Sequence, residues 1–185
     1  RDIASDPSAS IPPQATPNIR PTLVEDIDII LPDLAPRTLR EIDLYLADVP
    51  KRHRLSEVRG HVDDAVANAR ADTFCAGEMP VGIITHAPEH DYLYTTALPT
   101  EAYFSKAFLR LSRRYNDALV RRLGAELRAY SRSDAPEAAS WFRLMGFHPI
   151  GTEYGARIYA YPCETTITPD ARRIRPAAAR NTAMS

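Results

Sequence analysis

Hydrophobic positions change their period several times along the chain, and these changes divide it into helices and strands. The pattern predicts a strand at 18–24, followed by helices over 25–34, 39–46 and 56–69. Pro36 and Pro50 end the first two helices, because proline lacks the N–H that a helix interior needs, and Ser56 caps the third. Three helical segments therefore precede the predicted sheet.

The middle of the chain reads as a meander of antiparallel strands at 72–76, 81–86 and 92–98, with a hairpin turn at 77–80. One long helix is then predicted from Glu101 to Leu123, ended by Gly124. Its buried stripe is Phe104, Phe108, Leu111, Tyr115 and Leu119.

The last part of the predicted core is a strand, a short helix and a hairpin. The strand covers 126–131, and the helix is capped by Asp134 with Pro136 in its first turn. The hairpin pairs 147–150 with 156–161. The predicted fold class is therefore α/β in the α+β sense: a mixed, mainly antiparallel sheet flanked by helices.

Both ends of the chain differ in composition from this core. Residues 1–17 and 164–185 are rich in proline and small residues and have little to bury, so we expect extended tails around one domain at 18–163. The second tail is basic through Arg172, Arg173, Arg175 and Arg180. We expect both tails to lie on a partner.

Composition narrows the function only slightly. The chain has 185 residues, enough for one domain, and its formal net charge of −1 argues against wrapping of nucleic acid. Cys75 and Cys163 are too few for a disulfide framework or a zinc site. No stretch approaches the roughly 20 apolar residues of a membrane span. The sequence predicts a soluble protein.

The order of elements and one local segment carry a resemblance to a known family. The segment Glu137–Ile150, in which a short helix runs into Gly146-Phe147, resembles the corresponding part of the GCN5-related N-acetyltransferase (GNAT) superfamily. The resemblance covers residues 18–161. It implies a GNAT fold, and in working members of the superfamily it implies acyl transfer from an acyl-coenzyme A.

A narrower resemblance is to the acetyltransferase-like internal virion or head-associated proteins of short-tailed phages. It rests on Ile19-Arg20-Pro21-Thr22 with Glu25-Asp26, on Phe108–Arg114, and on Trp141 with Gly146-Phe147. This resemblance implies a virion location after assembly in the bacterial cytoplasm. The implied partners are other virion proteins of the capsid, portal or tail.

The cofactor loop of the superfamily is the part that this sequence lacks. In working members, a glycine-containing turn before the long helix holds the cofactor pyrophosphate with backbone N–H groups at a helix N-terminus. The equivalent stretch here is Leu98-Pro99-Thr100-Glu101-Ala102-Tyr103, and no glycine occurs between Gly82 and Gly124. Pro99 offers no N–H, and Glu101 is predicted to place a carboxylate in the first helical turn. We therefore expect no bound cofactor.

Candidate catalytic and metal-binding groups are weak. Such enzymes often use a carboxylate base and a tyrosine acid; Tyr130 is the one weak candidate, and packing is the commoner role for a strand tyrosine. His86 and His90 lack an ordered third ligand, so we expect no metal site. Asp63-Asp64 reads as the polar face of a helix rather than as an acid/base pair.

Basic residues form a row on the predicted long helix. They are Lys106, Arg110, Arg113, Arg114, Arg121 and Arg122, and only Asp117 interrupts them. Such a row is usually a solvated face, and the functional interpretation is a salt-sensitive contact with an acidic protein surface or with DNA. Together with the arginines of the second tail, these residues form the candidate contact surface.

Three hypotheses follow. The first is a catalytically inactive GNAT-fold structural or accessory protein of a tailed-phage virion, docked through its tails and exposed helix faces. The second is a divergent acyl-CoA-dependent N-acetyltransferase. The third is an accessory protein with non-specific nucleic-acid contacts, which the near-zero net charge disfavours.

Overall fold

A computed structural model describes residues 15–162 of the 185-residue chain. The elements in chain order are β1 (Pro17–Pro21), α1 (Val24–Ile30), the 3-10 turn η1 (Leu31–Asp33), α2 (Pro36–Tyr45), α3 (Lys51–Ala67), β2 (Ala71–Ala76), β3 (Met79–Pro88), β4 (Tyr92–Pro99), the 3-10 turn η2 (Glu101–Tyr103), α4 (Lys106–Leu123), β5 (Glu126–Ser131), α5 (Pro136–Leu144), β6 (His148–Glu153) and β7 (Ala156–Tyr161). The mixed α/β fold class is confirmed.

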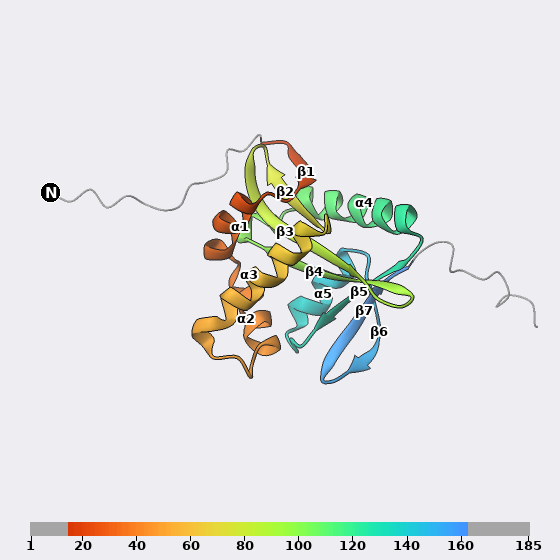
Figure 1. Cartoon of the computed structure of the whole chain (residues 1–185). Coiled ribbons are helices and arrows are strands. Elements are labelled where there is room, and N and C mark those ends of the chain that lie inside the picture. Colours follow the sequence, from red (N-terminus) through yellow and green to blue (C-terminus); the bar gives the residue numbers. More distant parts are fainter. Residues whose placement is uncertain (1–14, 163–185) are drawn as a thin grey trace, which may run out of the picture.

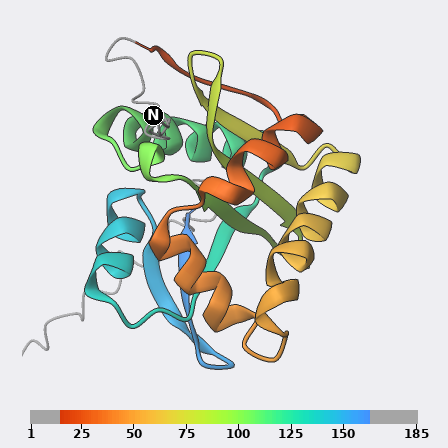
Figure 2. The ribbon, with the colours of Figure 1, turned by 90° about the vertical axis from the view of Figure 1, so that its left-hand side faces the viewer.

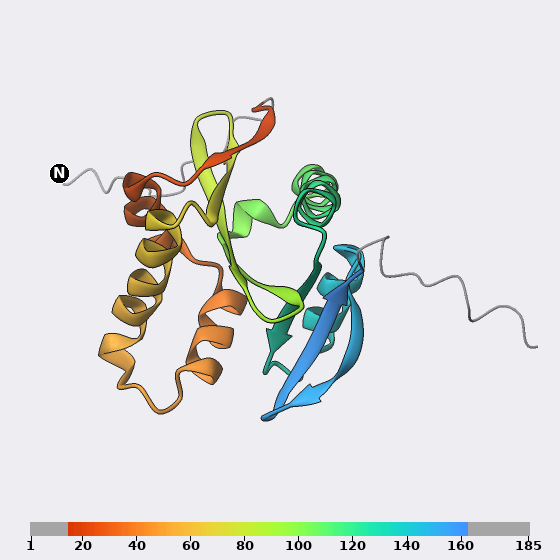
Figure 3. The same ribbon diagram turned by 45° about the vertical axis from the view of Figure 1, so that its right-hand side comes forward.

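One sheet of seven strands, in the order β1-β2-β3-β4-β5-β7-β6, forms the centre of the molecule (Figure 1). Among the strands described, β4 and β5 run parallel and every other neighbouring pair is antiparallel. Helices α1, α2 and α3 cover one face, onto which Figure 2 looks, while α4 and α5 cover the other (Figure 3). The sheet therefore has a hydrophobic layer on each face.

The layer beneath the first three helices is aliphatic. Ile27, Ile30 and Val62 from the helices pack against Ile83 and Leu98 of the sheet, and all five are buried. The layer beneath α4 and α5 is richer in aromatic rings, including Phe74, Tyr103, Phe108, Phe147 and Tyr159. Alternating burial along β5, with Leu127, Ala129 and Ser131 inward, is the period-two pattern of a strand that covers one core.

Several helix starts differ from the sequence-based prediction. Helix α3 begins at Lys51 and Ser56 lies inside it, where its hydroxyl donates to the His53 carbonyl instead of capping. Ala135, not Asp134, is the N-cap of α5. Pro36 opens α2 as its first residue instead of only closing the preceding helix, because proline fits the first helical position without losing a hydrogen bond.

The predicted long helix from Glu101 is wrong at its start. Residues Glu101–Tyr103 form the short 3-10 turn η2, and α4 begins only at Lys106, where the Ser105 hydroxyl accepts the Phe108 N–H at 3.4 Å. The C-terminus agrees with the prediction, since Gly124 ends the helix in the left-handed conformation at φ 63°. The break moves Phe104 off the predicted helical stripe.

The boundary between tail and domain lies slightly earlier than predicted. Pro17 is already the first residue of β1 and pairs with Ala76, and the Gly77 N–H donates to the Thr16 carbonyl. Residues 1–14 of the predicted first tail and the whole second tail, with Cys163 and the tail arginines, lie outside the described residues.

Candidate functional site

Strands β4 and β5 separate along their length, and this opening defines the candidate site. Their parallel pairing covers Tyr92 with Glu126, Leu93 with Leu127, and Tyr94 with Arg128. Beyond this point β4 continues to Pro99 along β3 alone, and β5 continues to Ser131 along β7 alone. The C-terminal ends of the two strands are therefore not joined by sheet hydrogen bonds.

Side chains from the segments that follow β4 and β5 meet across this opening. Phe104, just before α4, contacts Trp141 of α5 with ring centroids 4.7 Å apart at an interplanar angle of 68°. The Arg37 guanidinium lies 3.9 Å from the centroid of the Phe104 ring, a cation–π geometry. We call these three side chains the Arg37–Phe104–Trp141 stack. It joins the segments that follow β4 and β5 to the start of α2 through the protein's own side chains.

Backbone contacts fix Arg37 in this position. The Pro99 carbonyl at the end of β4 accepts the Ala35 N–H at 3.0 Å and the Thr38 hydroxyl at 3.2 Å. These bonds hold the start of α2 against the loop that leads to η2, and Arg37 then reaches Glu101 at 3.4 Å. Both partners of that ion pair are about half exposed, so the pair adds only about 0–1 kcal/mol.

Beneath the stack, Tyr103 anchors the η2 turn in the core. Its side chain is fully buried, and its hydroxyl lies 2.6 Å from that of Ser112 on α4. A Cβ at Gly82 of β3 would lie 3.0 Å from the Tyr103 ring, so this glycine is required for close packing. Tyr103 is therefore directed into the core, while Phe104 faces Trp141.

The structure changes the predicted reason why an anion would not bind at the start of the long helix, namely a carboxylate in its first turn. Glu101 lies in η2 and not in the first turn of α4, and the Pro99 carbonyl accepts a hydrogen bond from Ala35, next to the start of α2. The first turn of α4 has no acidic residue, and the N–H groups of Lys106 and Ala107 have no backbone partner within residues 15–162. The helix end itself is thus more favourable to a phosphate than the sequence suggests.

The space in front of that helix end is not favourable to coenzyme A. The fold family implies this cofactor, whose phosphates approach a glycine turn closely. Here Phe104 directly precedes the Ser105 cap, the stack joins it to Trp141, and the turn contains no glycine. The residues present do not fit coenzyme A in this conformation.

On the opposite face of the sheet the diverging strands carry a cluster of tyrosines. The Tyr92 and Tyr130 hydroxyls lie 3.2 Å apart, and the Tyr94 and Tyr130 ring centroids are 5.5 Å apart. The hydrogen bond with Tyr92 and partial burial raise the pKa of Tyr130 to about 12. The predicted candidate Tyr130 therefore lies beside the opening, but as a weak acid paired with a second phenol.

The Glu41 carboxylate, which the sequence analysis did not identify, binds the end of β5 and the loop that follows it. Glu41 of α2 accepts the Ser131 hydroxyl at 2.5 Å and the N–H groups of Arg132 and Ser133 at 3.2 and 3.3 Å. With these donors Glu41 anchors α2 to the loop after β5. Its partners lie 90 or more positions away, so no local pattern could reveal the role.

The remaining candidates are separated. His86 is buried in β3 while His90 is exposed in the following loop, and no group of metal ligands occurs in the described part of the chain. Asp63 and Asp64 are both exposed on α3, as a polar face requires. Among helices of residues 15–162, none is long and apolar enough to cross a membrane.

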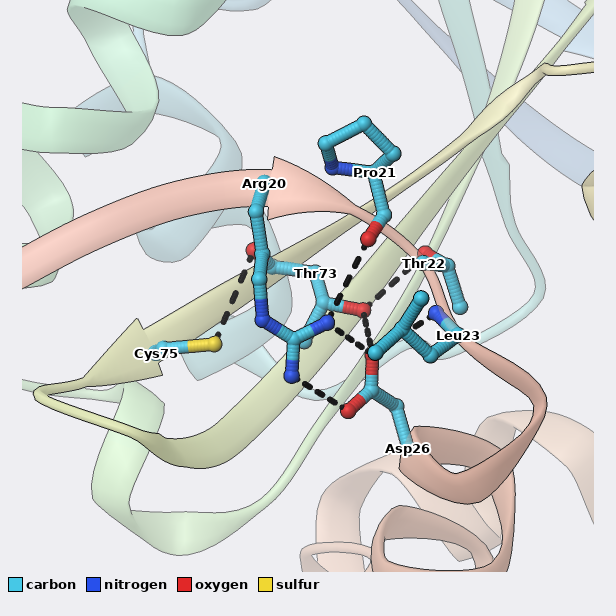
Figure 4. A network of polar contacts seen from close by, with 7 residues as sticks. All are labelled: Arg20, Pro21, Thr22, Leu23, Asp26, Thr73 and Cys75. Atoms are coloured by element: carbon cyan, nitrogen blue, oxygen red, sulfur yellow. Dashed lines mark hydrogen bonds and ion pairs between the residues drawn. The ribbon is translucent and has the colours of Figure 1, made fainter.

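The segment around Arg20 and Asp26 is a folding element. Asp26 is 2% exposed and accepts two bonds of 2.6 Å from the Arg20 guanidinium, plus bonds from the Leu23 N–H and the Thr73 hydroxyl (Figure 4). Burial opposes ionisation, but these donors outweigh it and hold the pKa of Asp26 below its ordinary value. The network ties β1, α1 and β2 together.

Packing likewise explains the Gly146-Phe147 pair. Gly146 has φ 91°, and a Cβ there would lie 2.7 Å from the Tyr161 ring, so only glycine fits between α5 and β6. Phe147 then packs against Tyr161 with centroids 5.4 Å apart. Both motifs are thus required by the fold, and neither distinguishes a virion protein from any other chain with this fold.

Comparisons with known proteins agree on the fold alone. No family model matches the chain, and no curated protein matches it. Solved structures do match. PaiA N-acetyltransferase from Thermoplasma acidophilum, in complex with coenzyme A, has a TM-score of 0.58 at 12% identity over 78% of this chain and 98% of its own.

Two further structures give similar values. An acetyltransferase from Thermus thermophilus has a TM-score of 0.55 at 18% identity, covering 78% of this chain and 96% of its own. The putative acetyltransferase YncA from Salmonella typhimurium, with its cofactor acetyl-CoA, has a TM-score of 0.54 at 13% identity, covering 84% and 99%. The chain has the GNAT fold. None of these three names refers to a virion.

Proposed function

We propose that this chain is a GNAT-fold protein that acts by binding other proteins and does not transfer acyl groups. The observation that carries the proposal is the Arg37–Phe104–Trp141 stack, which joins the segments that follow β4 and β5, where those two strands are no longer paired. A fold does not bring its chemistry with it when the site is occupied by side chains. The glycine-free turn supports the same conclusion.

The groups around the opening support the proposal as well. Glu41 is engaged by three donors and serves as an anchor, and the aromatic residues of α5 are Trp141 and Phe142, which carry no acidic proton to donate. Tyr130 shares its hydroxyl with Tyr92. General acid and base roles need a free, positioned group with a pKa near the working pH. Glu41 and Tyr130 are both engaged in hydrogen bonds, so neither meets this requirement.

A thiol-release assay tests the proposal. Acetyl-CoA is incubated with the protein and a panel of primary amines and amino-terminal peptides, and free coenzyme A is followed with a thiol reagent. We expect the rate to equal the protein-free rate for every acceptor. An enzyme-dependent rate that scales with protein concentration would reject the proposal.

The second candidate is an acyl-CoA-dependent N-acetyltransferase, and two observations favour it. The named structural neighbours are acetyltransferases, two of them with coenzyme A or acetyl-CoA. The N–H groups of Lys106 and Ala107 also remain without a backbone partner at the described helix end. This candidate requires Phe104 to move away from Trp141. Saturable acetyl-CoA binding with displacement of Phe104 would favour it over the first.

The partners that we propose are other virion proteins, in the particle that the narrower sequence resemblance indicates. The support is that resemblance, in which the arginine-rich segment Phe108–Arg114 is the part that packing does not explain. Deleting residues 1–14 or 163–185 tests the docking through tails. We expect a folded domain that no longer sediments with its assembly; full co-sedimentation would overturn the idea.

A further inference from the structure

Helix α4 has an uncompensated positive face. It carries six basic residues and one acidic residue, and all six basic side chains are exposed. Within residues 15–162 none of the six is in an ion pair, whereas Arg20, Arg37, Arg54, Arg59 and Arg128 all are. The single acid, Asp117, accepts the Tyr161 hydroxyl. The positive charge on this face therefore has no carboxylate paired with it in the described part of the chain.

The position of the charge along the helix makes the face unfavourable for the helix alone. Arg121 and Arg122 lie in the last turn, where cations stabilise the helix dipole. Lys106 is the first residue of the helix and Arg110 follows one turn later, near the positive end of the dipole. A cation in the first turn lowers helix stability by up to about 1 kcal/mol, and the effect falls off beyond that turn. Helix stability therefore does not explain the cation at Lys106.

A groove lies beside two of these arginines. It has a volume of about 390 Å³ and is lined by Thr16, Pro17, Ala107, Arg110, Leu111 and Arg114. One wall is the start of the edge strand β1, and the other is the outer face of α4. Ala107, Leu111 and Pro17 supply apolar lining beside the two arginines. None of the residues that line this groove belongs to the Arg37–Phe104–Trp141 stack.

We propose that this groove binds an extended acidic segment of a partner protein in which apolar residues alternate with carboxylates. Arg110 and Arg114 are one helical turn apart, which places their Cβ atoms about 5–6 Å from each other. Alternate side chains on one side of an extended peptide repeat at about 6.5 Å. Two carboxylates on one side of the peptide thus match the spacing of the two arginines, and the apolar side chains, which point to the opposite side, contact the apolar lining of the groove.

Two features favour a peptide over a nucleic acid. A phosphate backbone carries charge but no apolar side chain that would cover Ala107 and Leu111. The chain as a whole has net charge −1 while α4 is strongly positive, so the rest of the surface repels a long polyanion. Pro17 and Pro21 at the ends of β1 lack N–H donors and disfavour addition of a strand, so side chains carry the contact.

The test uses a fluorescein-labelled short peptide of alternating Asp and Leu, with fluorescence anisotropy as the readout. Arg110→Gln/Arg114→Gln removes the groove arginines. Arg113→Gln/Arg121→Gln removes the same charge from exposed positions of α4 outside the groove, and circular dichroism verifies that both variants fold. We expect binding to weaken about tenfold or more in the first variant and to change within about twofold in the second.

Other outcomes overturn the proposal. Equal loss in both variants shows a diffuse electrostatic field instead of a site. Binding of a duplex DNA of random sequence with no binding of the peptide makes this face a nucleic-acid interface. No binding of the peptide by the natural protein at low salt, where charge contacts are strongest, also rejects the site.

Discussion

Phe104 and Trp141 meet edge to face, 4.7 Å between centroids, at the point where the segments leaving β4 and β5 come together. Phe104 is held from above by Arg37 and lies next to the buried Tyr103, whose centroid is 5.9 Å away. Phe104 precedes α4, Trp141 lies in α5 and Arg37 lies in α2. The stack therefore links the two helices on one face of the sheet to α2 on the other. Removing it opens the site and weakens this connection.

Phe104→Gly/Trp141→Ala is expected to unfold more easily by about 3 kcal/mol, because two half-buried rings lose their packing. Urea denaturation measures the change. The same variant is expected to gain acetyl-CoA binding, since the turn then has space and a glycine before the Ser105 cap. Leu144→Ala, an exposed position on α5, is the control and changes neither quantity. A destabilised variant that still fails to bind shows that the stack is not what excludes the cofactor.

Gly82→Ala is expected to destabilise the protein by about 1–3 kcal/mol, because its Cβ would press at 3.0 Å on the fully buried Tyr103 ring. Gly60→Ala is the matched control, since nothing lies within 4 Å of a Cβ there and alanine favours a helix by about 1 kcal/mol. Thermal unfolding should therefore shift in opposite directions. A shift in the same direction for both variants contradicts the close packing at Tyr103.

Asp26→Asn is expected to cost about 3 kcal/mol at neutral pH, because the carboxylate accepts charged and neutral donors in the core. The pKa of Asp26 is lower in the folded state than its ordinary value of 3.8. Its ionised form therefore stabilises the fold fully above about pH 4, and this contribution is lost as the pH falls through the folded-state pKa.

Denaturant unfolding of both proteins between pH 7 and pH 2 checks the sign. The difference between the natural protein and Asp26→Asn should shrink as the pH falls. A difference that stays constant across this range would show that charge at Asp26 is not what the network requires.

His86 gives a second pH dependence, through a buried base instead of a buried acid. Burial lowers its pKa below the ordinary 6.5, with Arg122 and Arg70 acting in the same direction and Asp72 against it. Because the unfolded chain takes up the proton first, stability falls as the pH drops below about 6.5, until the folded-state pKa is reached. His86→Leu removes this slope. Unfolding free energies at pH 7 and pH 5 measure it, and an equal slope in both proteins contradicts the assignment.

Local sequence patterns predicted most of the fold because each depends on neighbouring residues. The helix stop at Gly124 and the strand at Glu126–Ser131 agree with the structure. The break at Phe104 did not follow from the pattern, since Glu101–Leu123 is uninterrupted by proline or glycine. It arises because Tyr103 is drawn into the core by Ser112 and Gly82.

The candidate site was harder to predict for the same physical reason. Missing glycine is visible in the sequence, but Arg37, Trp141 and Glu41 reach the site only through tertiary packing. The basic face of α4 was visible as a row of charges. The groove beside Arg110 and Arg114 required the position of β1, which lies far away in sequence.

The most direct measurement is a calorimetric titration of the natural protein with acetyl-CoA. A protein whose site is filled by the Arg37–Phe104–Trp141 stack is expected to give no saturable heat at concentrations where an acetyltransferase is half occupied, in the range of about 1 μM to 1 mM. Saturable binding within that range, with a stoichiometry of one, would contradict the exclusion of the cofactor and favour the acyltransferase instead.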